Sequence, residues 1–153
     1  AVLHGRRRAF CIYSVHHRGT PQRRGLVLGL AAGGSVKGAV YRVDEAIWPQ
    51  TYAYLREREQ PTETYFEAWR PVRLESGEAV RALVFLSDVN HPQWAGDLSP
   101  EAQARLIAGT SGLSGRNVDY LRDMVVHLRE AGVTDAPLER LLARVEALEA
   151  EAA

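Results

Sequence analysis

The apolar residues of this sequence change their spacing once, from strand-like in the first half to helix-like in the second. Short runs rich in β-branched and aromatic residues, separated by glycine and proline, fill residues 6–88. Beyond Ser99 the apolar residues recur at the three- and four-residue intervals of a helix. Strands followed by helices, rather than alternating with them, predict an α+β fold with a small antiparallel β-barrel-like sheet packed by C-terminal helices.

The strand patterns carry specific expectations. Residues 6–15 alternate in a way that predicts a mostly buried strand with a basic start, and Arg6–Arg8 are expected at a solvated sheet edge. Residues 26–32 and 35–43 are predicted to be two strands joined by a hairpin turn at the Gly33–Gly34 pair. A later hairpin is expected between residues 66 and 88, turning through Ser76-Gly77-Glu78.

The helical half has clear start signals and stripes. Ser99 followed by Pro100 is typical of a helix cap and first helical position. A second helix is expected to end at Gly132. Two apolar stripes are predicted to face a core: Leu121, Met124, Val125 and Leu128, then Leu138, Leu141, Leu142, Val145 and Leu148. We find no repeat or linker, so residues 1–153 are predicted to form a single domain.

Composition excludes some partners. Nineteen basic and nineteen acidic residues cancel, which argues against nucleic acid or an anionic membrane as a partner. No apolar run approaches the roughly 18 residues that a membrane helix needs. Cys11 is the single cysteine, so no intrachain disulfide can form and a reducing, cytoplasmic setting is expected. The sequence gives no indication of oligomeric state.

One carboxylate stands out in "YLREREQPTETY", residues 54–65. We expect a helix over residues 45–59, capped by Asp44 and kinked near Pro49, with Trp48, Tyr52 and Leu55 on one face. At about 100° per residue, Glu59 falls roughly 40° from Leu55, whereas Glu57 falls roughly 160° away and faces water.

A carboxylate on the apolar face at a helix C-terminus has two reasons for a raised pKa. Burial disfavours its charged form, and the negative end of the helix dipole adds to that effect. Such a group suits general acid/base catalysis near neutral pH. The other interpretation is that Glu59 is a structural residue that pairs with Arg56. Periodicity alone leaves both open.

Other candidates are weaker. Cys11 lies within a predicted strand and is expected to be a buried structural thiol. The histidines lack metal-ligand spacing, so no metal or cofactor is predicted. In "SGRNVDYL", residues 114–121, a glycine turn leads Asn117 and Tyr120 into a helix start. These residues could bind a ligand or could simply cap the helix.

Several stretches in order resemble the ChaC-like family of glutathione-specific γ-glutamylcyclotransferases. They are "FCIYSVHHRGTPQRRGLVLGL" (10–30), "GAVYRV" (38–43), "LREREQPTETYFEAW" (55–69), "DVNHPQWAGDLS" (88–99) and "SGRNVDYL" (114–121). The resemblance implies a cofactor-free, lyase-type reaction of the EC 4.3.2 class. In that reaction the α-amine of glutathione attacks its own γ-carbonyl, and 5-oxoproline and cysteinylglycine are released.

The resemblance also assigns roles to residues. The family's acid/base glutamate follows an arginine at an aromatic-Leu helix end, which corresponds here to Arg58-Glu59. Periodicity and resemblance therefore indicate the same residue. Tyr120 is expected to hydrogen-bond the substrate, and Arg18, or Tyr41 with Arg42, to meet a substrate carboxylate.

This sequence also departs from the family pattern. The family's glycine-rich "GYGSL"-type strand and turn, which hold the γ-glutamyl group, do not occur, so the domain is expected to lack its first strand. Arg24 stands where the family commonly has proline. The alternative function is therefore a non-catalytic binding or regulatory module on the same fold.

Overall fold

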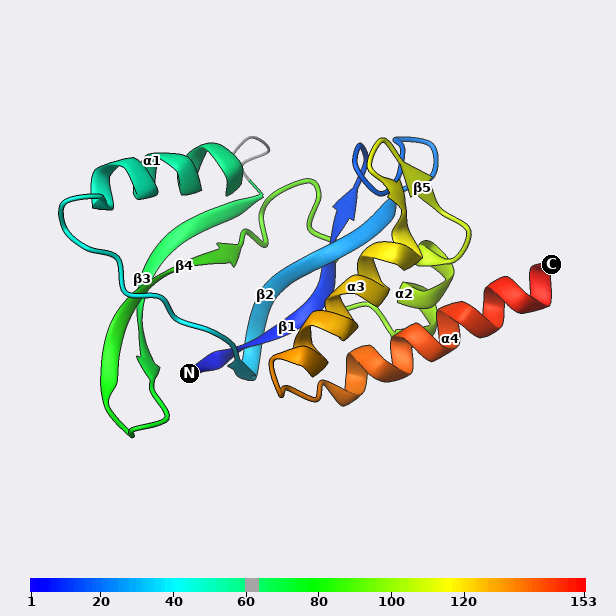
Figure 1. The fold of residues 1–153 in the computed structure, drawn as a ribbon. Coiled ribbons are helices and arrows are strands. Elements are labelled where there is room, and N and C mark those ends of the chain that lie inside the picture. The colour runs from blue at the N-terminus through cyan, green and yellow to red at the C-terminus, as the bar shows by residue number, and fades with distance from the viewer. Residues whose placement is uncertain (60–63) are drawn as a thin grey trace. The chain divides into compact units, whose positions relative to one another are not determined.

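The computed structural model describes residues 1–59 and 64–153, except for the side chain of Glu59 (Figure 1). Its main sheet has the strand order β2-β1-β3-β4. The strands are β1 (Val2–Ser14), β2 (Gly25–Lys37), β3 (Tyr65–Arg73) and β4 (Ala79–Ser87), with β5 (Ser111–Gly112) and β6 (Gly115–Arg116) forming a separate small pair. The helices are α1 (Trp48–Glu59), α2 (Pro100–Ile107), α3 (Asn117–Glu130) and α4 (Ala136–Ala152). The predicted α+β class, with an antiparallel sheet and helices, is confirmed.

Contacts divide the chain into two compact units. Unit 1 consists of Ala1–Ala9 and Gly29–Trp94, and unit 2 of Phe10–Leu28 and Ala95–Ala153. Because β1 and β2 cross these boundaries, each strand contributes residues to both units. The assignment of residues 1–153 to a single domain stays a prediction.

In unit 1 the hairpin of β3 and β4 is confirmed. The two strands pair antiparallel from Tyr65 opposite Ser87 to Arg73 opposite Ala79. Gly77 has a φ of 88° in the connecting turn, a conformation that glycine adopts without steric cost. β1 joins the other side of β3, with Val2 opposite Arg73. β3 therefore lies between β1 and β4. Helix α1 packs against β3 through Trp48 and Tyr52.

The predicted hairpin turn at Gly33–Gly34 is wrong, because β2 continues through both glycines to Lys37. Their φ values of 93° and 67° show that the glycines absorb an irregular backbone without ending the strand. Residues 38–44 contain no helix or strand, so the strand predicted over residues 35–43 is also wrong beyond Lys37. A glycine pair is an ambiguous signal, because it suits a turn and a distorted strand equally.

The sheet edge predicted for Arg6–Arg8 is also wrong, although the hydrogen bonds of Arg7 and Arg8 are exposed. β1 lies between β2 and β3 rather than at an edge of the sheet. Arg7 Nη1 donates to the carbonyl oxygen of Ala32 at 2.9 Å, and Arg8 Nη2 donates to that of Lys37 at 2.7 Å. Both acceptors are in β2, so these guanidinium groups cross-link neighbouring strands.

Unit 2 contains the helices that the sequence predicted. Ser99 caps α2, since its hydroxyl accepts from the amide of Ala102 at 3.2 Å, and Pro100 takes the first helical position. Asp135 caps α4 in the same way through the amide of Leu138. α3 is followed by Gly132, with a φ of 73°, as its sequence indicated.

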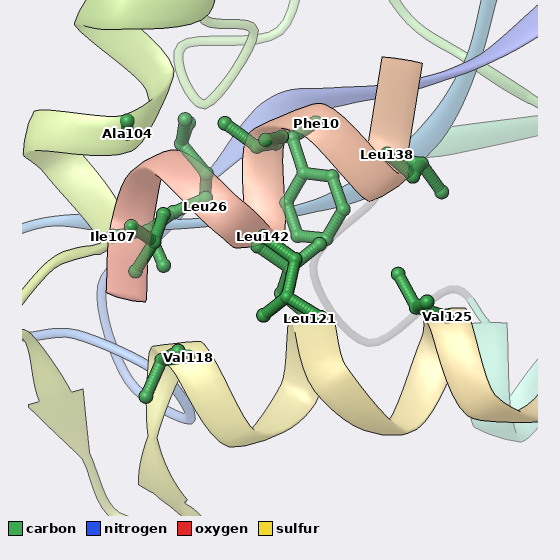
Figure 2. Packing of buried hydrophobic residues seen from close by; sticks show 11 residues of the cluster. Phe10, Leu26, Ala104, Ile107, Val118, Leu121, Val125, Leu138 and Leu142 are labelled. Atoms are coloured by element: carbon green, nitrogen blue, oxygen red, sulfur yellow. The ribbon is translucent and has the colours of Figure 1, made fainter. Parts of the chain in front are cut away.

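The core of unit 2 joins these helices to the adjoining segments of β1 and β2 (Figure 2). Phe10 and Leu26 come from the two strands and are almost completely buried. The predicted stripes of α3 and α4 pack around them, with the buried residues Leu121, Val125, Leu138, Leu141, Leu142 and Val145. Cys11 is buried as well, in agreement with its assignment as a structural thiol.

None of the helices in the described part of the chain has the length and hydropathy that a membrane crossing requires.

Candidate active site

Helix α1 begins later than predicted. It starts at Trp48 rather than at residue 45, and a turn closed by the Ile47 amide on the Asp44 carbonyl precedes it. Pro49 is consequently in the first helical turn, where a missing N–H costs nothing, so the expected interior kink is not needed. The predicted apolar face is confirmed, since Trp48, Tyr52 and Leu55 are all half-buried.

Glu59 is the last residue of α1, one turn beyond Leu55. Its side chain lies outside the described residues, as does all of Glu63, so the role of Glu59 stays a prediction. Glu57 is exposed, as the helical wheel indicated. Arg56 and Arg58 in the last turn are favourably placed near the negative end of the helix dipole.

Unit 1 has a cavity of about 1210 Å³ beneath the inner face of α1. Trp48, Thr51 and Leu55 from the helix and Trp69 from β3 line it. Apolar side chains predominate, and the polar lining includes Arg8, Arg42, Arg81, Glu45 and Glu78. A cavity of this size could receive a small molecule and offers charged groups of both signs.

Tyr41 and Arg42 also line this cavity. They belong to residues 38–44, which have no regular secondary structure, and the Tyr41 side chain is 82% exposed. A phenol this exposed on the rim of a cavity is accessible to a ligand. Its predicted role as a substrate contact remains a prediction.

In unit 2 the structure brings together two of the predicted substrate-binding residues. The Arg18 guanidinium lies 5.6 Å from the centroid of the Tyr120 ring, and its Nη1 donates to the carbonyl oxygen of Arg116 at 3.2 Å. Tyr120 itself packs edge-on against Phe10, and its hydroxyl accepts from the amide of Leu28 at 3.3 Å. Both side chains have clear structural contacts, and their roles toward a substrate stay predictions.

Asn117, by contrast, has a structural role. It is completely buried, and its amide group bonds both the N–H and the C=O of Leu26 at 2.8 Å each. This pair of bonds fixes the start of α3 to β2. The ligand contact considered for Asn117 is therefore corrected, because both ends of its amide are occupied by the backbone.

Sequence reasoning missed Glu67 on β3. Its Oε2 accepts from the hydroxyl of Tyr52 at 2.5 Å, and its Oε1 lies 3.1 Å from Nε of Arg56. The hydrogen bond to Glu67 is the main cause that raises the pKa of the Tyr52 phenol above its ordinary value. Arg56, expected as a partner of Glu59, thus has Glu67 as a partner. The alternation of β3, which puts Glu67 on the face of Trp69, was the available signal.

Among the described residues, no group of three or more His, Cys, Asp or Glu side chains is arranged to hold a metal ion. His17 does contact Ser114, Nδ1 to Oγ at 2.8 Å, but the pair is exposed. Near α1 the described residues provide the Glu67 carboxylate, the Tyr52 phenol and the Arg56 guanidinium.

An antiparallel sheet packed with helices, one of which ends at Arg58-Glu59, makes this chain a small mixed α+β protein. The profile of the ChaC-like protein family matches residues 1–148, and the chain belongs to that family.

Two comparisons give the relationship more detail. The glutathione-specific γ-glutamylcyclotransferase of Escherichia coli (strain K12) is 37% identical over 150 residues, which cover 98% of this chain. The match spans 65% of the length of that curated relative.

The fold has solved counterparts. A crystal structure of the yeast γ-glutamyl cyclotransferase specific to glutathione superposes with a TM-score of 0.80, at 22% identity, over 97% of this chain and 88% of the other. A selenomethionine-labelled crystal of that yeast enzyme gives 0.79, at 21% identity, over 95% and 86%. At this level of identity the likeness confirms the fold.

Proposed function

We propose that this protein is a γ-glutamylcyclotransferase that acts on glutathione and releases 5-oxoproline and cysteinylglycine. The observation that carries the proposal is membership of the ChaC-like family together with 37% identity to the E. coli enzyme of that name over nearly the whole chain. The cavity beneath α1 supports it, since it lies next to the helix whose last residue is Glu59.

The reaction is an intramolecular amide exchange. The α-amine of the γ-glutamyl group attacks the γ-carbonyl carbon, a five-membered lactam forms, and the bond to the cysteine nitrogen breaks. The α-amine has a pKa of about 8 and is mostly an ammonium at neutral pH, so a base must remove a proton before attack. The leaving nitrogen must then receive one. A single carboxylate can perform both transfers in turn, and no redox or metal chemistry is required.

In this proposal Glu59 is that carboxylate. The C-terminal end of a helix raises the pKa of a nearby acid, which brings its basicity closer to that of the amine. Leu55, one turn earlier, faces the cavity, so a substrate in the cavity would lie close to the end of the helix. Holding amine and carbonyl in attack geometry would supply most of the remaining acceleration.

The other predicted residues would bind rather than react. The family resemblance is the ground for proposing Tyr41, Arg18 and Tyr120 as substrate-binding residues. The proposal needs no cofactor and no nucleic-acid partner. It places the enzyme in the cytoplasm, where glutathione is kept reduced and where the buried thiol of Cys11 suits the redox conditions.

The proposal can be tested by mass spectrometry. We would incubate the protein with reduced glutathione and measure 5-oxoproline and cysteinylglycine, using both the 153-residue chain and the product of the complete open reading frame that encodes it. We expect 5-oxoproline and cysteinylglycine to form in equal amounts. Glu59→Gln should reduce kcat by at least roughly a hundredfold, because the amide cannot transfer the proton.

Glu57→Gln is the matched control, since it removes an exposed carboxylate two residues away on the same helix. Its rate should equal that of the wild type. Product formation that survives Glu59→Gln would remove Glu59 from the mechanism. A folded protein that forms no product in either length would contradict the enzyme assignment and favour a binding module.

A further inference from the structure

The packing of α1 on β3 has a regular register. Trp48 lies against Trp69, with ring centroids 6.0 Å apart, and Tyr52 bonds Glu67. Four residues along a helix rise about 6 Å, and two residues along a strand span about 6.6 Å. The matched steps show that α1 runs antiparallel to β3 along one face of the strand. In this register Glu67 makes polar contacts with Tyr52 and Arg56 of the helix.

Glu67 makes two contacts to α1 on successive turns. One carboxylate oxygen receives the Tyr52 hydroxyl and the other the Arg56 guanidinium. The side chain of Glu67 is 20% exposed and its bond with Tyr52 is partly shielded from water, whereas the Arg56 side chain is 55% exposed. The Arg56 guanidinium also lies 5.6 Å from the Tyr52 ring centroid, so each of the three residues contacts the other two. We call these three residues the Glu67 anchor.

The anchor is close in sequence to the end of α1. Arg56 precedes Glu59 by three residues, and residues at that spacing on a helix have Cβ atoms about 5–6 Å apart. A shift of Arg56 would therefore shift the last helical turn. Helix ends fray easily unless tertiary contacts hold them, and this anchor is such a contact.

We propose that Glu67 is a positioning residue for the cyclotransferase reaction, which holds the last turn of α1, and with it Glu59, in the reactive geometry through Tyr52 and Arg56. This inference rests on the proposed function. It assigns to β3 a role in the reaction that neither the family motif nor the helical wheel indicated. Glu67 acts through its two partners and is not required to touch the substrate.

The expected effect follows from geometry. A misplacement of about 1 Å can reduce the rate about a hundredfold, whereas substrate binding elsewhere is unaffected. Glu67→Ala should therefore lower kcat roughly ten- to a hundredfold and leave KM within about twofold. Glu67→Gln keeps an acceptor for Tyr52 but loses the charge that holds Arg56, and it should have an intermediate kcat.

The test measures kcat and KM for the wild type, Glu67→Ala, Glu67→Gln and the control Glu75→Ala. Glu75 is an exposed glutamate in the β3–β4 turn of the same unit, and its variant should match the wild type. Circular dichroism and thermal melting would establish that each variant is folded. Tyr52→Phe alone and combined with Glu67→Ala completes a double-mutant cycle, in which the combined loss should be smaller than the product of the single losses.

The outcomes separate the two proposals. A wild-type protein without cyclotransferase activity overturns the proposed function and this inference together. An active wild type whose folded Glu67→Ala and Glu67→Gln variants keep their kcat overturns the positioning role alone. A rise in KM at constant kcat would also overturn it, because Glu67 would then act in binding. A lowered kcat with independent Tyr52 and Glu67 effects would contradict the shared anchor.

Discussion

At the scale of single residues, buried polar groups hold this fold at a few specific places. Asn117 is the clearest, since it satisfies the donor and the acceptor of one β2 residue that is 91 positions away in the sequence. Arg23 acts similarly nearer the surface, with bonds to the Thr110 hydroxyl and the Ala108 carbonyl. Such groups fix how strands and helices meet, which apolar contacts alone do less specifically.

Replacement of Asn117 by alanine should destabilise the protein by about 2–4 kcal/mol. It leaves the N–H and C=O of Leu26 without their partner in a buried setting, and each unsatisfied group costs about 1–3 kcal/mol. Urea denaturation followed by circular dichroism measures the change. The control is Asn90→Ala, which changes the other asparagine of the chain, an exposed one. Its free energy of unfolding should stay within about 0.5 kcal/mol of the wild type. If Asn117→Ala lowers the free energy of unfolding no more than Asn90→Ala does, the stabilising role of the Asn117–Leu26 hydrogen bonds is contradicted.

At the scale of elements, helices and strands differ in what specifies them. α2 and α4 are capped by Ser99 and Asp135, each through a bond to an amide in the first turn. β2 depends instead on two glycines with positive φ that let it continue. The strand is therefore more sensitive to substitutions that change backbone freedom than to loss of a side chain.

Gly33→Ala should destabilise the fold by about 1–2 kcal/mol. A Cβ at this position would meet nothing within 4 Å, so the cost arises from the φ of 93° and not from a clash. Gly38→Ala is the matched control, because Gly38 is equally open but has no positive φ of this kind. In thermal melts Gly33→Ala should have a lower melting temperature than Gly38→Ala. Equal melting temperatures would show that β2 does not need the glycine conformation.

At the scale of the whole molecule, the two units share the strands β1 and β2. Unfolding of either unit would release part of both strands and remove support from the other. The prediction of one domain therefore has a physical basis in chain continuity, even though contacts cluster in two groups.

We accordingly expect the chain to unfold in one cooperative transition. Differential scanning calorimetry should give a calorimetric enthalpy equal to the van't Hoff enthalpy, as for a two-state domain. Residues of the two units should also report the same midpoint, for example Trp48 fluorescence in a variant without the other tryptophans and circular dichroism of the helices. Two separated transitions would contradict the single-domain prediction.

The elements with local signals could be predicted from the amino-acid sequence alone. The stripe of α4, the Ser99 cap, the β3–β4 hairpin and the inner face of α1 were predictable, because a helix or hairpin is specified by residues within a few positions. The family and the choice of Glu59 as candidate acid/base also followed from sequence. The elements rest on short-range spacing, the family rests on the resemblance of several stretches between residues 10 and 121, and Glu59 rests on both.

Three features became visible only in the folded chain: the continuation of β2 through Gly33–Gly34, the two hydrogen bonds of Asn117 with Leu26, and the pairing of Arg56 with Glu67. Spacing along the chain predicted a turn at the two glycines, left a ligand contact and a helix cap open for Asn117, and gave no indication of Glu67 as a partner of Arg56. The physical reason is the same in each case. A glycine, an amide or a guanidinium can satisfy several environments, and the environment is supplied by residues that are distant in the sequence.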